Sequence, residues 1–290
     1  MDFLSAIFYG IVQGITEFLP VSSSAHLAAI PHYLKIEDPG VYFDLMMHFG
    51  TALALVLYFR KRIWQLGRIS LKATLGLIAP AASDLGNEGD QLLQRNLSLF
   101  RNFLFSSIVT VIVILLVKDI SINYARNHTF IAINLIIFGI LLFAVDFWAQ
   151  KRFGLIATYE MESRFQFKKA LLIGIAQAIA IFPGVSRSGI TITTGRFLGL
   201  SREESSNYSF LLSIPIVLLA AGLKLAETLS IALVQEDTPT ISPLVLLTAL
   251  LVSFLVGLAT IHYFLKLINK IPFIAFTLYR ILLAILLLVS

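Results

Sequence analysis

Residues 10–18 of the chain read GIVQGITEF, and a related stretch, GIAQAIAIF, recurs at residues 174–182. The glutamines of the two stretches, Gln13 and Gln177, set an offset of 164 positions between the copies, since 177 minus 13 is 164. Self-similarity at a fixed offset is the sequence signature of a duplicated structural unit. The pattern therefore predicts two related halves within one chain.

The composition places both copies in a membrane. Of the 290 residues, 58% are hydrophobic and 13% are charged, which is more apolar surface than a soluble domain of this size can bury. Apolar runs close to the roughly 20 residues that cross a hydrocarbon core recur along the chain. We therefore expect an all-α, polytopic membrane protein with about six transmembrane helices. These spans are expected near residues 41–59, 101–118, 129–149, 208–227, 242–264 and 272–289.

Each copy of the repeat has the pattern of a re-entrant helical hairpin. The register continues past the first nine residues, because Val-Ser at residues 21–22 recurs at residues 185–186. A short apolar segment is broken by Pro20 in the first copy and by Pro183 in the second, and a serine-rich turn with another short apolar segment follows. Non-helical backbone at membrane depth is tolerated only where it is buried in protein or lines a wet cavity. The breaks are therefore expected to line a site.

Three of the expected spans follow each hairpin. An odd number of crossings places the two hairpins on opposite faces of the membrane, so the sequence predicts an inverted-topology repeat whose breaks meet near the midplane. We assign residues 1–150 to the first repeat and residues 165–290 to the second, within a single membrane domain.

The basic residues lie between the apolar runs, mainly within residues 60–101 and 151–169. Cytoplasmic loops are enriched in Lys and Arg, so both loops are expected to be cytoplasmic, and the first hairpin then enters from outside. This distribution also argues against a nucleic-acid partner, despite a net charge of +5, because the basic residues do not share one soluble face. Residues 63–82 are expected to form an interfacial helix, and residues 83–90 a flexible tip.

The sequence contains no cysteine, which excludes disulfides, thiolate catalysis and cysteine-based metal sites. Any metal must therefore use oxygen or imidazole ligands. No basic region precedes the first apolar stretch, so we expect no removable signal peptide.

The first hairpin gathers groups that carry chemistry. Gln13 and Glu17 are four residues apart and share one face of a helix. An ionisable side chain at membrane depth is costly and usually functional, so Glu17 is expected to have a role beyond packing. Four further candidates follow the break: Ser22, Ser23, Ser24 and His26. Capping of the next helix is an equal alternative for Ser22 and Ser24, whereas for His26 we favour an acid–base role over that of a satisfied interior histidine.

The second hairpin has the composition of an anion-binding turn. Residues 183–191 read PGVSRSGIT and place glycines, hydroxyls and one arginine at a helix start. Exposed amides at the positive end of a helix favour phosphate, and the guanidinium of Arg187 can bind two phosphate oxygens. Snorkelling to the interface is the alternative for Arg187, and simple capping is an equal alternative for the hydroxyls. The residues assigned to substrate binding are Gly184, Ser186, Ser188 and Thr191, with Gln13, Ser22 and Ser24 of the first hairpin.

Together the hairpins predict a pocket with an acidic, imidazole-bearing half opposite a cationic, hydroxyl-rich half. Such a pocket suits the phosphate of a lipid. His48 belongs to the span that follows the first hairpin, and there we favour an interior histidine with satisfied ring nitrogens over a place beside the pocket.

The two motifs resemble those of a known family. Residues 13–26, QGITEFLPVSSSAH, look like the first motif of the BacA/UppP family of bacterial undecaprenyl pyrophosphate phosphatases, and residues 183–191 look like its second motif. The resemblance covers the whole chain in length, span pattern and motif order. It implies a multi-pass enzyme of the bacterial inner membrane that hydrolyses undecaprenyl pyrophosphate to undecaprenyl phosphate and inorganic phosphate. The site is then expected to open toward the periplasmic or outer face.

The resemblance also implies a cofactor and a cellular role. The lipid carrier is recycled for peptidoglycan synthesis, and overproduction in the family gives resistance to bacitracin, which sequesters the pyrophosphate substrate. A divalent cation, Mg²⁺ or Ca²⁺, is implied, and we assign Glu17 and Gln13 as its ligands. The family position of Gln13 holds either Glu or Gln, which puts a strict two-carboxylate site in doubt. By matching positions, the functional residues are Glu17, Ser23, His26, Ser186, Arg187 and Thr191.

The chemical step is left open by the sequence. Either Ser23 attacks the terminal phosphorus with His26 as base or acid, or His26 or Glu17 activates water directly. We favour Ser23 as the nucleophile, with Arg187 and the hairpin amides stabilising charge on the transferred phosphoryl group.

An alternative function belongs to a different class. Inverted repeats with broken helices that meet at the midplane are the usual plan of secondary transporters, so a carrier or flippase for a polyprenyl phosphate lipid is the second hypothesis. The expected partners are the lipid substrate and the surrounding membrane lipids. The sequence leaves open whether copies of the chain form a homo-oligomer.

Overall fold

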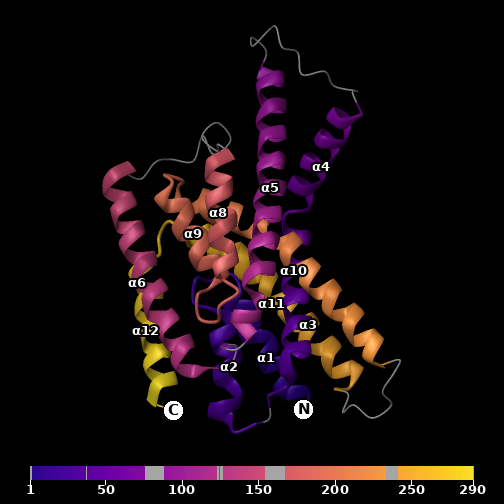
Figure 1. Ribbon diagram of the computed structural model, residues 1–290, viewed down its shortest axis with the longest axis vertical. Coiled ribbons are helices and arrows are strands. Elements are labelled where there is room, and N and C mark those ends of the chain that lie inside the picture. The colour runs from indigo at the N-terminus through magenta and orange to yellow at the C-terminus, as the bar shows by residue number, and fades with distance from the viewer. Residues whose placement is uncertain are drawn as a thin grey trace.

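The computed structural model describes residues 2–36, 38–75, 88–122, 124, 127–153, 167–232 and 241–289. Within these residues every regular element is a helix, as the apolar runs predict (Figure 1). The helices are α1 (Phe3–Thr16), α2 (Ser23–Leu34), α3 (Gly40–Tyr58), α4 (Arg60–Thr74), α5 (Glu88–Ile122), α6 (His128–Phe153), α8 (Phe167–Ile179), α9 (Arg187–Phe197), α10 (Arg202–Ala232), α11 (Pro243–Leu267) and α12 (Phe273–Val289).

The described helices form a polytopic membrane protein. Four segments are long and apolar enough to cross a bilayer by themselves: Asn96–Lys118 of α5, His128–Phe153, Arg202–Leu223 of α10, and Pro243–Leu267. The bent pair α3 and α4 is a fifth candidate. The last of the six expected spans corresponds to α12, an apolar helix of 17 residues that packs against α6.

The helix expected at the membrane interface is present, with different bounds. α4 spans Arg60–Thr74, so it begins three residues before the expected start, and residues 76–82 of the expected helix lie outside the described residues. The axis of α4 is bent by 71° from that of α3. It begins with three basic residues, and the side chain of Trp64 is exposed, as suits a helix in the interfacial plane. Of the expected tip, residues 83–87 lie outside the described residues and residues 88–90 begin α5.

Both expected hairpins are formed, by α1 with α2 and by α8 with α9. Ser22 and Ser186, which match at the offset of 164, have the same unusual backbone conformation, with φ of 71° and 72°. Figure 1 shows the first hairpin rising from the lower end of the molecule and the second descending from the upper end, so that their turns meet. Equal backbone at matching positions and entry from opposite ends support the proposed inverted repeat.

The packing of the hairpins follows the same symmetry. α1 packs against α11, which is the second long span after the other hairpin, and α8 packs likewise against α5. Small residues allow these close approaches: a Cβ on Gly10 would lie 2.9 Å from the carbonyl oxygen of Ala249, and a Cβ on Gly174 would lie 2.7 Å from that of Ser106. Gly10 and Gly174 are again 164 positions apart. Each hairpin therefore packs against a long helix from the other half of the chain.

Arg280 of α12 joins the two helix breaks, a role that the sequence analysis did not identify. Its guanidinium is fully buried and donates hydrogen bonds to the carbonyl of Pro20 at 3.3 Å and to those of Gly184 and Val185 at 2.8 and 3.1 Å. It also donates to the carbonyls of Leu135 and Asn134 on α6. Because a broken helix leaves carbonyls without partners, one arginine here satisfies both breaks.

We expect Arg280→Met to destabilise the fold strongly. The substitution removes the donor shared by these buried carbonyls, and leaving such groups unsatisfied costs about 3 kcal/mol or more in total. A loss of this size lowers the midpoint of thermal unfolding by about 10 °C, which thermal denaturation in detergent measures. Arg68→Met, at an exposed position of α4, is the matched control and is expected to leave the midpoint unchanged. Equal midpoints for the two variants would contradict the role of Arg280.

Candidate functional site

A cavity of about 350 Å³ lies where the two hairpin turns meet. Its polar lining comes from both hairpins and from α3, and its apolar lining comes mainly from α10 and the second hairpin, with one residue each from α3 and α5. The polar residues are Thr16, Glu17, Ser22, Ser23, Ser24, His48, Gln177, Ser186 and Arg187. The helix breaks of both hairpins therefore line a cavity. This agrees with the expectation that non-helical backbone inside a membrane lies beside a cavity or is buried in protein.

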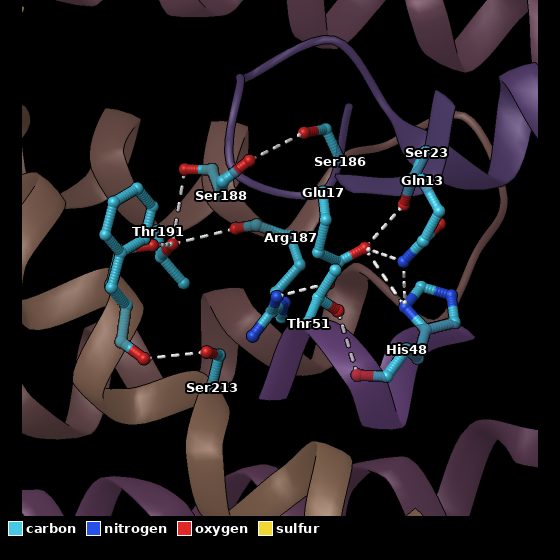
Figure 2. A network of polar contacts seen from close by, with 12 residues as sticks. Gln13, Glu17, Ser23, His48, Thr51, Ser186, Arg187, Ser188, Thr191 and Ser213 are labelled. Atoms are coloured by element: carbon cyan, nitrogen blue, oxygen red, sulfur yellow. Dashed lines mark hydrogen bonds and ion pairs between the residues drawn. The ribbon is translucent and has the colours of Figure 1, made fainter. Parts of the chain in front are cut away.

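Glu17 is the centre of the polar contacts shown in Figure 2. Its carboxylate is buried, and its Oε2 accepts hydrogen bonds from Ser23 Oγ at 2.7 Å and from Gln13 Nε2 at 3.0 Å. His48 Nδ1 lies 3.0 Å from the same oxygen. A buried carboxylate needs such donors to remain charged. The first hairpin and α3 together provide them.

Arg187 completes the site from the second hairpin. Its Nη2 forms an ion pair with Oε1 of Glu17, which joins the two halves of the chain across the cavity (Figure 2). Its other terminal nitrogen, Nη1, is buried and has no acceptor among the described residues. A guanidinium that lines a cavity with one donor unused is suited to bind an oxyanion.

Two helix starts point their first turns at this cavity. α2 follows Ser22 and α9 follows Ser186, and both serines line the cavity. The side chain of Ser186 caps α9 by accepting from the amide of Gly189 at 3.1 Å, whereas Ser22 makes no side-chain cap to α2. Helix N-termini carry partial positive charge and amide donors, so the pair favours an anion between them.

The serine motifs also hold the hairpins together. Ser24 Oγ accepts from the amide of Gly184 at 3.4 Å, and Ser188 Oγ donates to the carbonyl of Leu19 at 3.0 Å. Gly184 has a φ of +88°, and a Cβ at this position would collide with the carbonyl oxygen of Ile131. Gly184 and Ser188 do not line the cavity, so their observed contacts are structural.

His26 and Thr191 also lie away from the cavity, contrary to the expected convergence. The ring nitrogens of His26 contact the carbonyl of Ser22 through Nδ1 and Tyr279 Oη through Nε2, both at 2.7 Å, and the ring stacks on Tyr279. Thr191 Oγ1 lies 2.6 Å from Ser209 Oγ of α10. Ser23 is consequently hydrogen bonded to Glu17 and not to His26. Of the site residues predicted from the sequence, Glu17, Ser22, Ser23, Ser24, Ser186 and Arg187 line the cavity, and Gln13 lies directly behind Glu17.

His48 is the main site residue that the sequence analysis placed wrongly. We favoured an interior histidine away from the pocket, but its side chain lines the cavity, is 26% exposed and contacts both Glu17 and Gln13. The Nδ1 of His48 is 2.8 Å from Gln13 Nε2, so the three side chains form one polar cluster. The signal available in the sequence for this position was an ionisable residue, His48, within an apolar span.

We expect His48→Phe to lower kcat/KM for the reaction at this site about 10- to 100-fold, as the loss of a group that orients a reacting residue does. His48→Gln keeps a donor for Glu17 and is expected to restore most of the activity, which a purely space-filling role would not explain. Steady-state kinetics of both variants test this, with His262→Phe, an exposed position of α11, as the control. Wild-type activity of His48→Phe would refute the assignment.

The residues around Glu17 fit a divalent cation only in part. No cluster of three carboxylate, imidazole or thiol side chains suited to a metal exists among the described residues. One buried acceptor, Gln13 Oε1, has no hydrogen-bond partner in the described part of the chain. Mg²⁺ is commonly bound by one or two protein ligands together with substrate phosphates, so Glu17 fits a cation that is shared with a phosphorylated ligand. Gln13 fits the same ion only with its amide turned, so that Oε1 and not Nε2 faces Glu17.

The fold and the site define a polytopic membrane protein with a cavity at the meeting of two opposed hairpins, lined by the paired carboxylate of Glu17 and guanidinium of Arg187. The chain belongs to the family of the bacitracin resistance protein BacA, whose family model matches residues 6–286.

Curated relatives align over nearly the whole chain. Undecaprenyl-diphosphatase of Marinobacter nauticus is 39% identical over 284 residues, which cover 98% of this chain and 97% of the relative. The proteins of the same name from Idiomarina loihiensis and Aliivibrio salmonicida are 38% and 40% identical, each over 287 residues. These alignments cover 99% and 98% of this chain and 98% and 96% of the two relatives.

Proposed function

We propose that this chain is an undecaprenyl-diphosphatase, which hydrolyses undecaprenyl pyrophosphate to undecaprenyl phosphate and inorganic phosphate. The observation that carries the proposal is the meeting of Glu17 and Arg187, from opposite hairpins, in one cavity within the membrane. Family membership and the names of the relatives support the same activity. The product is the recycled lipid carrier of peptidoglycan synthesis, and removal of the pyrophosphate form accounts for resistance to bacitracin.

The cavity binds the pyrophosphate through its cationic side. The Nη1 donor of Arg187 and the first-turn amides of α2 and α9 contact phosphate oxygens, and the surrounding serines donate further hydrogen bonds. The substrate competes for the guanidinium that otherwise pairs with Glu17. These groups are fixed before the reaction, so they stabilise the charge that develops on the transferred phosphoryl group.

Glu17 and Ser23 carry the nucleophilic step. Ser23 Oγ donates to Glu17 Oε2 at 2.7 Å, so the carboxylate can take the proton when Ser23 attacks the terminal phosphorus. The anhydride bond to the bridging oxygen then breaks, undecaprenyl phosphate leaves, and water releases inorganic phosphate from the serine in a second step. In the alternative sequence, Glu17 takes a proton from water, which attacks the phosphorus directly. In both reaction sequences, Arg187 and His48 hold the carboxylate of Glu17 in place.

A divalent cation is part of the proposal. Glu17 and Gln13 would hold Mg²⁺ or Ca²⁺, which would neutralise phosphate charge when bound. Because Gln13 supplies a neutral oxygen, this chain provides one carboxylate where two would bind the ion more tightly.

The cavity lies toward the outer end of the spans in the proposed orientation. Ser121, at the end of α5, donates to the carbonyl of Ile181 at 2.8 Å, and Ile181 lines the cavity. The basic residues at the α3–α4 junction and at the end of α6 mark the opposite, cytoplasmic side. We therefore place the protein in the bacterial inner membrane with its site near the periplasmic or outer face.

Hydrolysis is tested with purified protein in detergent and undecaprenyl pyrophosphate as the sole substrate. The expected products are inorganic phosphate and undecaprenyl phosphate in equal amounts, identified by mass spectrometry, with release that stops on addition of a chelator and resumes with Mg²⁺ or Ca²⁺. Release of pyrophosphate, or no release from folded protein, would contradict the proposal.

Lipid transport is the second candidate function, because opposed hairpins that meet inside the membrane also suit alternating access. Liposomes that contain a hydrolysis-inactive variant and labelled undecaprenyl phosphate distinguish the two functions. Movement of the label between leaflets would add transport to the hydrolase, and its absence would remove the transport hypothesis.

A further inference from the structure

A row of apolar cavities continues from the candidate site along the seam between α5 and α10. The cavity beside the site, of about 220 Å³, shares Ile216 with the phosphate cavity. A third cavity, of about 250 Å³, shares Pro215 with the second and ends at the first turns of α4. Each cavity therefore adjoins the next at a shared residue, and we call the second and third cavities the α5–α10 seam.

The order of the cavities is the same along both helices. On α5, Ile114 lines the site, Ile112 lines the second cavity and Phe100 lines the third. On α10, Ala220 lines the site and Leu211 lines the third cavity. At 1.5 Å per helical residue, the fourteen positions between Ile114 and Phe100 correspond to about 20 Å. The seam is therefore a track that runs along the helices away from the polar site.

The chemistry of the seam suits a hydrocarbon. Its lining is almost entirely aliphatic and aromatic, and the one phenol, Tyr208, has its hydroxyl 2.9 Å from Ser106 Oγ. One wall is open to the bilayer, because Ile112 and Leu219 are 52% and 45% exposed. An open wall matters because a long lipid chain enters a membrane protein sideways from the bilayer and does not thread through a closed tunnel.

We propose that the α5–α10 seam binds the prenyl chain of the substrate and favours long-chain over short-chain pyrophosphates. The proposal rests on the proposed function, which fixes the pyrophosphate in the phosphate cavity. Because the seam adjoins the phosphate cavity at Ile216, it is the apolar surface that begins beside the headgroup. Pro215 lines both cavities, and as a proline inside α10 it leaves one helix carbonyl without its usual backbone hydrogen bond there.

The test narrows the seam and compares two substrates. Leu219→Trp and, on the opposite wall, Ile112→Trp place an indole in the second cavity. The value of kcat/KM is measured with undecaprenyl pyrophosphate and with dimethylallyl pyrophosphate, whose five-carbon chain ends close to the phosphate cavity. We expect each variant to lose about tenfold with the long substrate, since apolar contact with the chain is lost, and to lose little with the short one. Leu116→Trp, a 76% exposed position of α5 outside the seam, is the matched control.

The outcomes separate this inference from the proposed function. Wild-type protein that hydrolyses neither substrate would refute the function itself. Wild-type kcat/KM of both seam variants on undecaprenyl pyrophosphate, or an equal loss in Leu116→Trp, would overturn the seam while leaving the function intact. An equal loss with both substrates would also overturn it, because the indole would then act on the headgroup site.

Discussion

Arg187→Lys is expected to lower kcat/KM for phosphate release about 10²- to 10³-fold, the usual effect of removing one preorganised donor to a developing charge. Lysine keeps the positive charge but loses the planar fork, so it does not hold Glu17 and a phosphate oxygen in the fixed geometry that the guanidinium provides. Since the ion pair joins the two hairpins, both kcat and KM are expected to change. Steady-state release of inorganic phosphate from undecaprenyl pyrophosphate measures the effect.

The control for this prediction is Arg152→Lys, the same change at an exposed position at the end of α6. It is expected to have wild-type kinetics. If Arg187→Lys retained more than half of the wild-type kcat/KM, Arg187 would serve only as a cation near the membrane interface, which is the snorkelling alternative.

Glu17→Gln is expected to reduce kcat/KM about 10³-fold or more, because the residue is proposed both to accept a proton and to hold a cation. The substitution preserves size, so the cavity keeps its shape, but it removes the charge and replaces one acceptor oxygen with an NH2 donor. Arg187 then has no counter-ion, and Ser23 loses the carboxylate that accepts its hydrogen bond. Glu203→Gln, in the first turn of α10, is the matched control.

The double variant of Glu17 and Arg187 distinguishes a shared site from two separate contributions. Residues that act as a unit are strongly non-additive, so the double variant is expected to be little worse than Glu17→Gln alone. Full additivity of the two losses on a free-energy scale would show that the residues act independently, against the geometry of the ion pair.

The sequence predicts the hairpins well because their causes are local. Pro20 and Pro183 break the helices within a few residues of where the structure breaks them, and the offset of 164 leads directly to Ser22 and Ser186, which share a positive φ. Hydrophobic runs predict the spans for the same reason. The last span, expected near residues 272–289, agrees with α12, Phe273–Val289, to within one residue.

Contacts between distant segments were beyond the reach of local patterns. His26 follows the serines by one turn, yet its ring direction is fixed by Tyr279, which lies 253 positions away. Arg280 sits in an otherwise apolar helix, and only the meeting of both breaks beside α12 shows what it bonds. His48 likewise gains its place in the site from the packing of α3 against the first hairpin.

The most direct measurement is an experimental structure of the protein with a non-hydrolysable prenyl bisphosphonate. We predict the two phosphonate groups in the cavity between the hairpin turns, with Arg187 Nη1 and the starts of α2 and α9 as donors and Glu17 beside them. A bisphosphonate bound outside this cavity, with Glu17 and Arg187 still paired to each other, would contradict the account.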